Sequence, residues 1–314
     1  MLVIGSQAMR LGLEEIGMAL GRVPTDLDVF AREYEVGPFL TKAGLDLLKM
    51  SLGKTLCKDP NGNFVEIEHA KPGTSTDLYL DYAEKMALLD QKEFYGLNMH
   101  VAPLGMLYSI KRAHRHSPCQ FEKHVKDYNR LRTLLRGRDP LARITMLRYY
   151  ETTEREKLHT PSLNKSTTDF FDDKVSNRTF VHDQIHEVMA FGERPMFEKI
   201  KIDPSKVACS KQKFFALTHE QRDHCVQEEA YVIALERHII PILFESGKIM
   251  SSICAYKWAL MRICTTLCSG WFREYAVENY DNLMLRYNWT YTDKFLKAVE
   301  EERIKRIEKK EELI

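Results

Sequence analysis

The sequence predicts an α+β protein, with a mixed sheet and flanking helices first and a mainly α-helical region after it. Short apolar or alternating runs typical of strands occur between residues 1 and 104, whereas helical periodicity dominates from about residue 143. A polar stretch at 160–168 indicates a loop. We therefore expect two domains, residues 1–140 and residues 141–314, the second ending in a charged helix over 300–314.

Length and composition set bounds on function without selecting one. The chain has 314 residues and a formal net charge of +1, so no overall attraction to a polyanion is expected. It has no secretory leader and no apolar run of about 18 residues, which predicts a soluble protein that does not span a membrane. Its seven cysteines are scattered without a Cys-x-x-Cys pair, which favours reduced thiols and a cytoplasmic location.

The first thirty residues predict a strand, a helix and a second strand. The apolar run 1–4 ends at Gly5-Ser6, and a helical segment follows over about 7–20. The next strand carries Asp26-Leu27-Asp28-Val29-Phe30. Because strand side chains alternate between faces, the two aspartates are expected to point the same way, with the intervening apolar side chains toward a core.

Paired carboxylates beside a phosphate site indicate metal-assisted phosphoryl transfer. Asp26 and Asp28 offer hard oxygen ligands, for which a divalent ion such as Mg²⁺ is the natural partner. The Gly5-Ser6 turn opens a helix, and a helix N-terminus binds phosphate readily. The bland alternative is two solvated acids after a turn.

A strand, a Gly-Ser turn, a helix and Asp-Leu-Asp in this order resemble the DNA polymerase β-like nucleotidyltransferase superfamily. Residues 21–28, Gly-Arg-Val-Pro-Thr-Asp-Leu-Asp, look most similar to tRNA CCA-adding enzymes and toxin-type nucleotidyltransferases. The resemblance implies that Asp26 and Asp28 hold Mg²⁺ (or Mn²⁺) and that Gly5 and Ser6 bind the outer phosphates of a nucleoside triphosphate.

The resemblance also implies a third carboxylate on a later strand. Residues 54–58 are expected to form a strand, 59–63 form a turn cluster, and 64–68 alternate apolar and acidic side chains. Glu66 and Glu68 then point together, so either one can complete the metal site. We favour Glu66, which lies deeper in the predicted strand, although an ordinary edge strand with a wet face has the same pattern.

Two lysines are candidates for phosphate binding. A short strand near 101–104, a helix containing Lys111, and Lys126-Asp127 at the start of another helix follow an order similar to that of toxin-type nucleotidyltransferases. The resemblance implies that Lys111 neutralises the nucleotide phosphates, with Lys126 as the second candidate. The alternative is that Lys111 only extends its stem along an amphipathic helix.

Residues 111–148 carry most of the charge asymmetry. This stretch has eleven Lys or Arg against three Asp or Glu, a local balance of +8. The basic residues are Lys111, Arg112, Arg115, Lys123, Lys126, Arg130, Arg132, Arg136, Arg138, Arg143 and Arg148. Beside a phosphate-transfer site, such a stripe favours a nucleic-acid acceptor, the alternative being a solvated helix face.

The second half contains two constellations that could carry chemistry. One is the aromatic stretch 271–280, with Trp271 and Tyr275 on one helix face, and its spacing favours core packing over ligand contact. Long helical runs are expected at 175–191, 218–239, 248–268 and 271–287, the second of them starting with a capping box formed by Thr218 and Gln221. On the first, His182-Asp183 and His186 lie four residues apart on one face, the spacing of paired metal-binding histidines. The alternative is two histidines bonded at a helix interface.

The sequence therefore predicts a metal-dependent nucleotidyltransferase that moves a nucleoside monophosphate to a hydroxyl of a nucleic acid or a protein. Two alternatives remain open. One is a metal-dependent phosphoesterase that uses His182, Asp183 and His186. The other is a non-catalytic protein that keeps the fold and binds nucleic acid through the basic stripe. No motif indicates the base, the acceptor or the oligomeric state.

Overall fold

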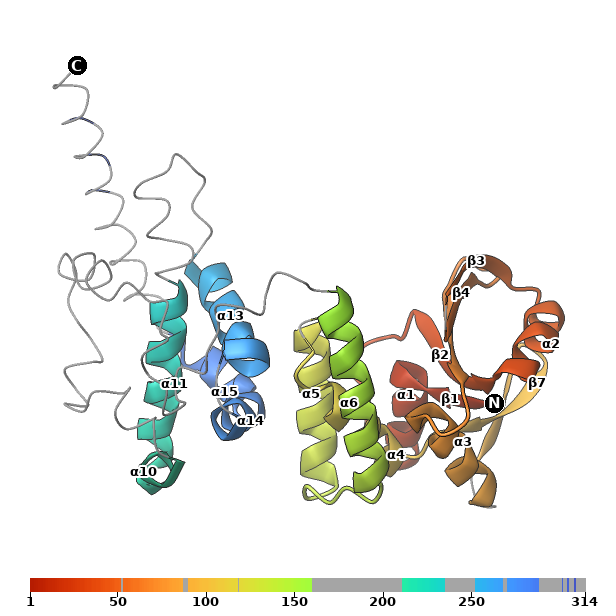
Figure 1. Ribbon diagram of the computed structural model, residues 1–314, viewed down its shortest axis with the longest axis horizontal. Coiled ribbons are helices and arrows are strands. Elements are labelled where there is room, and N and C mark those ends of the chain that lie inside the picture. Colours follow the sequence, from red (N-terminus) through yellow and green to blue (C-terminus); the bar gives the residue numbers. More distant parts are fainter. Residues whose placement is uncertain are drawn as a thin grey trace. The chain divides into compact units, whose positions relative to one another are not determined.

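The computed structural model describes residues 1–51, 53–86, 90–117, 119–159, 211–234, 252–267 and 270–287, together with 301, 304 and 308. The chain forms two compact units (Figure 1). The first contains Met1–Arg115 and Lys126–His159, and the second contains His116–Val125 and Thr160–Ile314. The α+β class is confirmed, because every strand of the described chain lies in the first unit and the described part of the second is helical.

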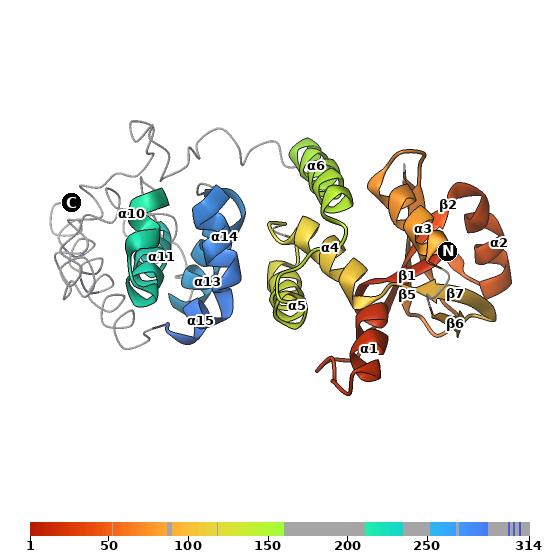
Figure 2. The same cartoon turned by 90° about the horizontal axis from the view of Figure 1, so that it is seen from below.

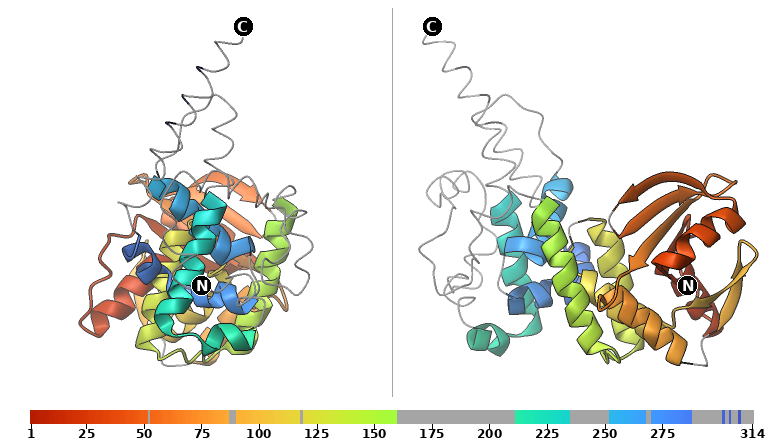
Figure 3. Two further views of the ribbon diagram at one scale, coloured as in Figure 1. Left: turned by 90° about the vertical axis from the view of Figure 1, so that its left-hand side faces the viewer. Right: turned by 45° about the vertical axis from the view of Figure 1, so that its right-hand side comes forward.

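A seven-stranded mixed sheet is the framework of the first unit, with strand order β3-β4-β5-β2-β1-β7-β6. The strands are β1 (Leu2–Ile4), β2 (Asp26–Arg32), β3 (Asp46–Ser51), β4 (Lys54–Lys58), β5 (Phe64–Ala70), β6 (Gln91–Phe94) and β7 (Leu97–Val101). β1 pairs with β7 in parallel and β2 pairs with β5 in parallel, whereas the other neighbours are antiparallel. The hairpin β3–β4 forms one edge of the sheet (Figure 3).

Helices cover both sides of this sheet (Figure 2). They are α1 (Gly5–Glu15), α2 (Glu33–Ala43), α3 (Ser75–Lys85), α4 (Leu104–His114) and α6 (Ala142–His159). A further helix, α5 (Phe121–Leu134), lies between α4 and α6 in the sequence and begins with residues of the second unit. α3 and α6 pack on the face that carries Phe30, whose ring stacks on Tyr79 and lies under the guanidinium of Arg148. α2 lies on the opposite side of the sheet (Figures 1 and 2).

The alternation predicted for the second strand is confirmed. Leu27 and Val29 are buried, whereas Asp26 and Asp28 are partly exposed on the other face. The buried set continues into β5 through Val65 and Ile67. Burying these apolar side chains on one face leaves the acidic side chains of the same strands on the other.

Helix α1 is shorter than expected. It ends at Glu15 rather than near residue 20, because Gly17 adopts a positive φ of 72° that a continuing helix cannot contain. The first unit, by contrast, continues past residue 140 to His159. The reason is that α6 packs on α3 and α4 and joins the sheet through Arg148.

In the second unit, the described helices are α10 (Lys211–Ala216), α11 (His219–Ala234), α13 (Ser252–Arg262), α14 (Gly270–Glu278) and α15 (Tyr280–Leu285), with a π-helical turn, η3, at Ile263–Leu267. The capping box expected before α11 is confirmed. Gln221 N–H donates to Thr218 Oγ1 at 3.2 Å, and Thr218 N–H donates to Gln221 Oε1 at 3.0 Å.

An aromatic core holds these helices together. Phe214 is fully buried, and its ring centroid lies 5.2 Å from those of Trp271, Phe272 and Tyr275. The aromatic stripe on α14 is therefore packing material, as its helical spacing suggests. Within the described part of the chain, no helix is long and apolar enough to cross a membrane.

Candidate active site

Three acidic side chains come together in register on one face of the sheet. Asp26 and Asp28 lie two residues apart on β2, and Asp28 pairs directly with Glu66 on the parallel neighbour β5. Neighbouring strands are about 4.8 Å apart, so Glu66 starts one strand spacing from Asp28. The expectation that the two aspartates share a face with this glutamate follows from the register and is met.

The Gly-Ser turn lies against the second aspartate. Ile4 pairs with Asp28 across β1 and β2, so Gly5 follows directly at the edge of the site. Gly5 has a positive φ of 67°, and a Cβ built on it would lie 1.9 Å from Asp28 Oδ2. Only glycine fits there, because the Asp28 carboxylate occupies the space of a side chain.

A chain of polar contacts connects this turn to α4 and α5. The side chain of Arg22 donates from Nη2 to Ser6 Oγ at 3.3 Å and to both carboxylate oxygens of Asp127 at 2.8 Å. Lys111 Nζ lies 3.1 Å from Asp127 Oδ2. Asp127 and Lys111 are both buried, with side chains 2% and 8% exposed, so this is an interior ion network at the base of the turn.

Sequence reasoning missed the importance of Arg22 and Asp127. It singled out Lys126 instead, which lies exposed on α5. The available signal was helical phase, because Asp127 falls with the buried Tyr128 and Leu131 on the apolar side of α5. Lys111 is on that network, but its ammonium is bound to Asp127.

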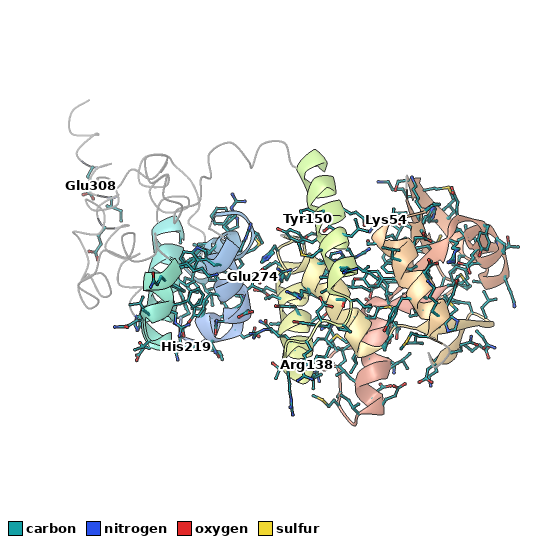
Figure 4. The ribbon with its side chains drawn as sticks, turned by 60° about the horizontal axis from the view of Figure 1, so that its bottom comes forward. Lys54, Arg138, Tyr150, His219, Glu274 and Glu308 are labelled. Atoms are coloured by element: carbon teal, nitrogen blue, oxygen red, sulfur yellow. The ribbon has the colours of Figure 1, made fainter. Side chains whose placement is uncertain are left out.

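The structure separates the two glutamates of β5 by environment. Glu68 is buried and accepts two hydrogen bonds from Arg148, Nη1 to Oε1 at 3.0 Å and Nη2 to Oε2 at 2.9 Å. It also accepts one from Thr76 Oγ1 at 2.5 Å. Glu66 is half-exposed, and its carboxylate forms an ion pair with Lys54, which is labelled in Figure 4. Through Arg148, Glu68 therefore links α6 to the sheet. Glu66 is the glutamate whose carboxylate lies beside the two aspartates.

The donor atoms of this site are all carboxylate oxygens. Asp26, Asp28 and Glu66 supply only hard oxygen ligands, which suit Mg²⁺. Nevertheless, in the ranges that the structure describes, no group of three or more His, Cys, Asp or Glu is arranged to hold a metal. The carboxylates of the two aspartates are suitable ligands for a divalent ion. Glu66 is paired with Lys54, so it can act as the third ligand only after this ion pair breaks.

An open depression lies beside the turn. It is lined by Gln7, Arg10, Glu14 and residues 17–24 and has a volume of about 860 Å³. This volume is within the range of small-molecule sites, about 300–1,000 Å³. Because Gln7 follows the Gly5-Ser6 turn directly and Arg22 contacts Ser6, the depression adjoins the candidate phosphate site.

Much of the basic stretch 111–148 is used inside the fold. Lys111 and Arg148 are buried in ion pairs, and Arg112 pairs with Asp139 at 3.1 Å. Arg130 donates to the carbonyls of Ala19 and Leu20. Arg115 lies over the ring of Tyr149. The exposed cations of the stretch include Lys126, Arg136, Arg138 and Arg143. The local excess of charge in the sequence therefore overstates the positive surface.

The second candidate cluster, His182, Asp183 and His186, lies outside the described residues. A metal site on this cluster needs a further ligand from elsewhere in the chain, for which Asp223 is one candidate. The side chain of Asp223 is fully buried and has other partners. It accepts a hydrogen bond from Tyr275 Oη at 2.6 Å and one from Arg286 Nη1 at 2.9 Å. The phosphoesterase alternative stays a prediction.

The fold and the site define an α+β protein whose central strands present carboxylates beside a Gly-Ser helix start. The model of the family described as "Domain of unknown function (DUF7275)" matches residues 106–297, more than half of the chain, and the chain belongs to this family. The matched region includes Lys111 and Asp127 and begins after the strand carboxylates. Comparisons with curated proteins and with solved structures gave no match.

Proposed function

We propose that this protein is a metal-dependent nucleotidyltransferase, which moves a nucleoside monophosphate from a nucleoside triphosphate to an acceptor hydroxyl. The observation that carries the proposal is the register of Asp26, Asp28 and Glu66 on one sheet face, with Gly5 against Asp28. Paired carboxylates beside a helix N-terminus combine a cation site with a phosphate site, which is what phosphoryl transfer requires.

Each residue has a role in this proposal. Gly5 and Ser6, at the N-terminus of α1, bind the outer phosphates through backbone N–H groups. Arg22 stands beside Ser6 and adds positive charge. The depression next to the turn has room for the rest of the nucleotide. Asp127 holds Arg22 in place, because both of its oxygens accept from the same guanidinium.

Asp26 and Asp28 would hold the divalent ion, and Glu66 would join them on release from Lys54. When bound, the ion neutralises charge on the transferring phosphate and promotes ionisation of the acceptor hydroxyl. The acceptor oxygen forms a bond to the α-phosphorus while the bond from that phosphorus to the bridging oxygen breaks. Pyrophosphate leaves, and the hydroxyl proton passes to water or a site carboxylate. The contribution of the chain is positioning and electrostatics.

The experiment is a label-transfer assay. The protein is incubated with Mg²⁺ and each of the four α-³²P-labelled nucleoside triphosphates, with mixed RNA and with protein acceptors. Asp26→Asn/Asp28→Asn is the test variant, and Asp90→Asn, at an exposed position before β6, is the control. Transfer by the native chain and the control, with none by the double variant, supports the proposal. Absence of transfer with all four nucleotides and a folded protein overturns it and directs attention to His182→Ala.

A nucleic acid is the acceptor class that the sequence favours, and the exposed cations of α5 and the α5–α6 loop remain available for it. The non-catalytic alternative predicts nucleic-acid binding without any turnover. In that case the same assay detects no label transfer, whereas binding falls steeply as salt rises.

A further inference from the structure

An exposed aromatic ring lies next to the site carboxylates. Phe64 is the first residue of β5, pairs in register with Asp26 on β2, and is 46% exposed. On its other side it pairs with Lys58 of β4, whose ammonium lies 5.3 Å from the ring centroid. Because paired residues point to the same side of a sheet, Asp26, Phe64 and Lys58 form one row on the face of the site.

The next row on this face has the same character. Asp28 pairs with Glu66, and Glu66 pairs with Leu56 of β4. Leu56 in turn pairs with Lys49, an exposed residue of β3. We call the surface formed by Lys54, Leu56, Lys58, Phe64 and Glu66 the β4–β5 face. Lys54, labelled in Figure 4, projects from it and pairs with Glu66.

This face is not part of the core. On β4 and β5 the buried side chains of Cys57, Val65 and Ile67 point to the other side, and on the side of Phe64 burial begins only further along β5, at Glu68. A ring left half in water contributes only part of the roughly 2 kcal/mol by which full burial of a phenylalanine side chain stabilises a fold. Phe64 therefore has no evident packing role, and its position beside the carboxylates suggests contact with a ligand.

The order of the strands in the sheet determines which substrate would reach Phe64. In the sheet, β1 with the Gly5-Ser6 turn lies on one side of β2, and β5 with β4 lies on the other. In an in-line displacement, the leaving pyrophosphate and the attacking hydroxyl are on opposite sides of the α-phosphate. If the outer phosphates lie at Gly5-Ser6, the acceptor must approach over β5 and β4. This step rests on the proposed function.

We propose that the β4–β5 face binds the single-stranded end of a nucleic-acid acceptor. Phe64 stacks on an unpaired base, and Lys58 and Lys54 contact the adjoining phosphates. Base–aromatic stacking with flanking cations is the usual way in which proteins hold single strands without reading their sequence. The ammonium group of Lys58 lies over the ring of Phe64, and that of Lys54 is paired with Glu66. A nucleic acid whose phosphates bind both ammonium groups therefore uncovers the ring and releases the carboxylate of Glu66.

The β4–β5 face and the neighbouring strand carry charges of both signs. On β3 to β5 the same side carries Lys49, Lys54 and Lys58 against Asp46, Glu66 and Glu68, and Glu68 is already neutralised by the buried Arg148. The lysines are therefore in slight excess, and the carboxylate nearest to the aspartates is already paired with one of them. This charge balance favours contact with a few phosphates at the end of a nucleic acid over binding along a long stretch of its backbone.

The test is direct binding without catalysis. A 3′-fluorescein single-stranded RNA 12-mer of mixed sequence is titrated with the full chain in EDTA, and anisotropy is recorded. Phe64→Ala is expected to weaken binding by about 5- to 100-fold, the range of one lost stacking contact, whereas Phe64→Trp keeps it. Tyr34→Ala, which removes a 74% exposed ring from α2, is the matched control and leaves the affinity unchanged.

The lysine is tested by salt dependence. Lys58→Gln is expected to lower the slope of log affinity against log salt by about 0.7, the value for one phosphate contact on a single strand. Lys92→Gln, on the exposed strand β6, is the control and keeps the slope. Circular dichroism melts of all variants establish that they are folded.

The outcomes separate this inference from the proposed function. RNA binding that depends on Phe64 and Lys58 supports the proposed role of the β4–β5 face even where label transfer is absent. In that case only the proposed function fails. If Phe64→Ala and Lys58→Gln both bind the RNA with unchanged affinity, the proposal for the β4–β5 face is wrong even where label transfer occurs. Label found on a protein acceptor with no RNA binding overturns it as well.

Discussion

The carboxylate of Asp28 lies where a side chain of Gly5 would begin, with Oδ2 1.9 Å from the position of a Cβ. Two residues 23 positions apart in the sequence thus share one small space at the start of α1. The contact exists because Ile4 pairs with Asp28, so that the chain must turn into the helix directly over the carboxylate. It joins the turn that we propose binds phosphate to the strand that we propose holds the metal.

Gly5→Ala is expected to abolish nucleotidyl transfer and to destabilise the fold by about 1–3 kcal/mol, because the methyl group displaces the Asp28 carboxylate and a positive φ is strained for alanine. Label transfer and urea unfolding measure the two effects. Gly96→Ala is the control, since Gly96, between β6 and β7, has a φ of 71° with no atom within 4 Å of the added Cβ. A similar loss of transfer in both variants would mean that backbone strain alone is responsible.

Asp127→Asn is expected to weaken nucleotide binding and to lower the free energy of unfolding by about 3–5 kcal/mol. The reason is that Arg22 and the buried Lys111 lose their common counter-charge. Calorimetric titration with a non-hydrolysable nucleotide and urea unfolding measure the effects. Lys126→Gln removes the neighbouring exposed charge and should change stability by less than about 0.5 kcal/mol. Equal stability of the Asp127 and Lys126 variants would contradict the network.

Glu66 and Glu68 are expected to behave in opposite ways. Glu68→Gln breaks a buried ion pair with Arg148 and should lower the unfolding free energy by several kcal/mol, on the order of the 3–5 known for such pairs. Glu66→Gln removes a pair that is 44% exposed on both sides, so stability should hardly change while label transfer falls. The reverse pattern would make Glu68 the functional acid.

Stability is expected to fall in acid through Asp139. Burial by itself raises the pKa of this carboxyl, but hydrogen bonds from Ser109, Thr145 and the N–H of Leu141, together with the charge of Arg112, outweigh it and lower the pKa. A pKa lower in the folded than in the unfolded state gives stability that is present above the unfolded value, about 3.9 for Asp, and lost below it.

Urea unfolding at several pH values between about 7 and 3 measures this contribution. The native chain should be more stable than Asp139→Asn at neutral pH, and the difference should shrink once the pH falls below about 4, as the carboxyl gains its proton. Asp90→Asn, at an exposed site, provides the control. A difference that stays constant down to pH 3 would show that Asp139 acts through packing and not through its charge.

Local patterns in the sequence determined a large part of the first unit. Alternation in 26–30 and 64–68 predicted β2, β5 and the shared face of their acids, and the interval 54–58 coincides with β4. The capping box of Thr218 and Gln221 is likewise a property of four consecutive residues. Such features depend on neighbours along the chain, so they can be read without knowing the fold.

Other elements had no local signal. All six residues of β3 are exposed, so that strand shows no alternation, and α2 contains Pro38 inside a helix. The sequence pattern around Lys111 also did not indicate that this lysine forms an interior ion pair instead of acting as an exposed phosphate ligand. Its partner Asp127 is sixteen residues away on another helix, and Arg22 is more than a hundred residues from that aspartate.

The sequence by itself thus determined the α+β fold class, the strand that carries Asp26 and Asp28, and the shared face of these two side chains. Only the tertiary structure decided which glutamate stands beside them and which lysine or arginine has a counter-charge. The physical reason is that side-chain alternation follows from the backbone of a few residues. The pairing of Glu68 with Arg148 or of Glu66 with Lys54 depends instead on which distant segments pack against each strand.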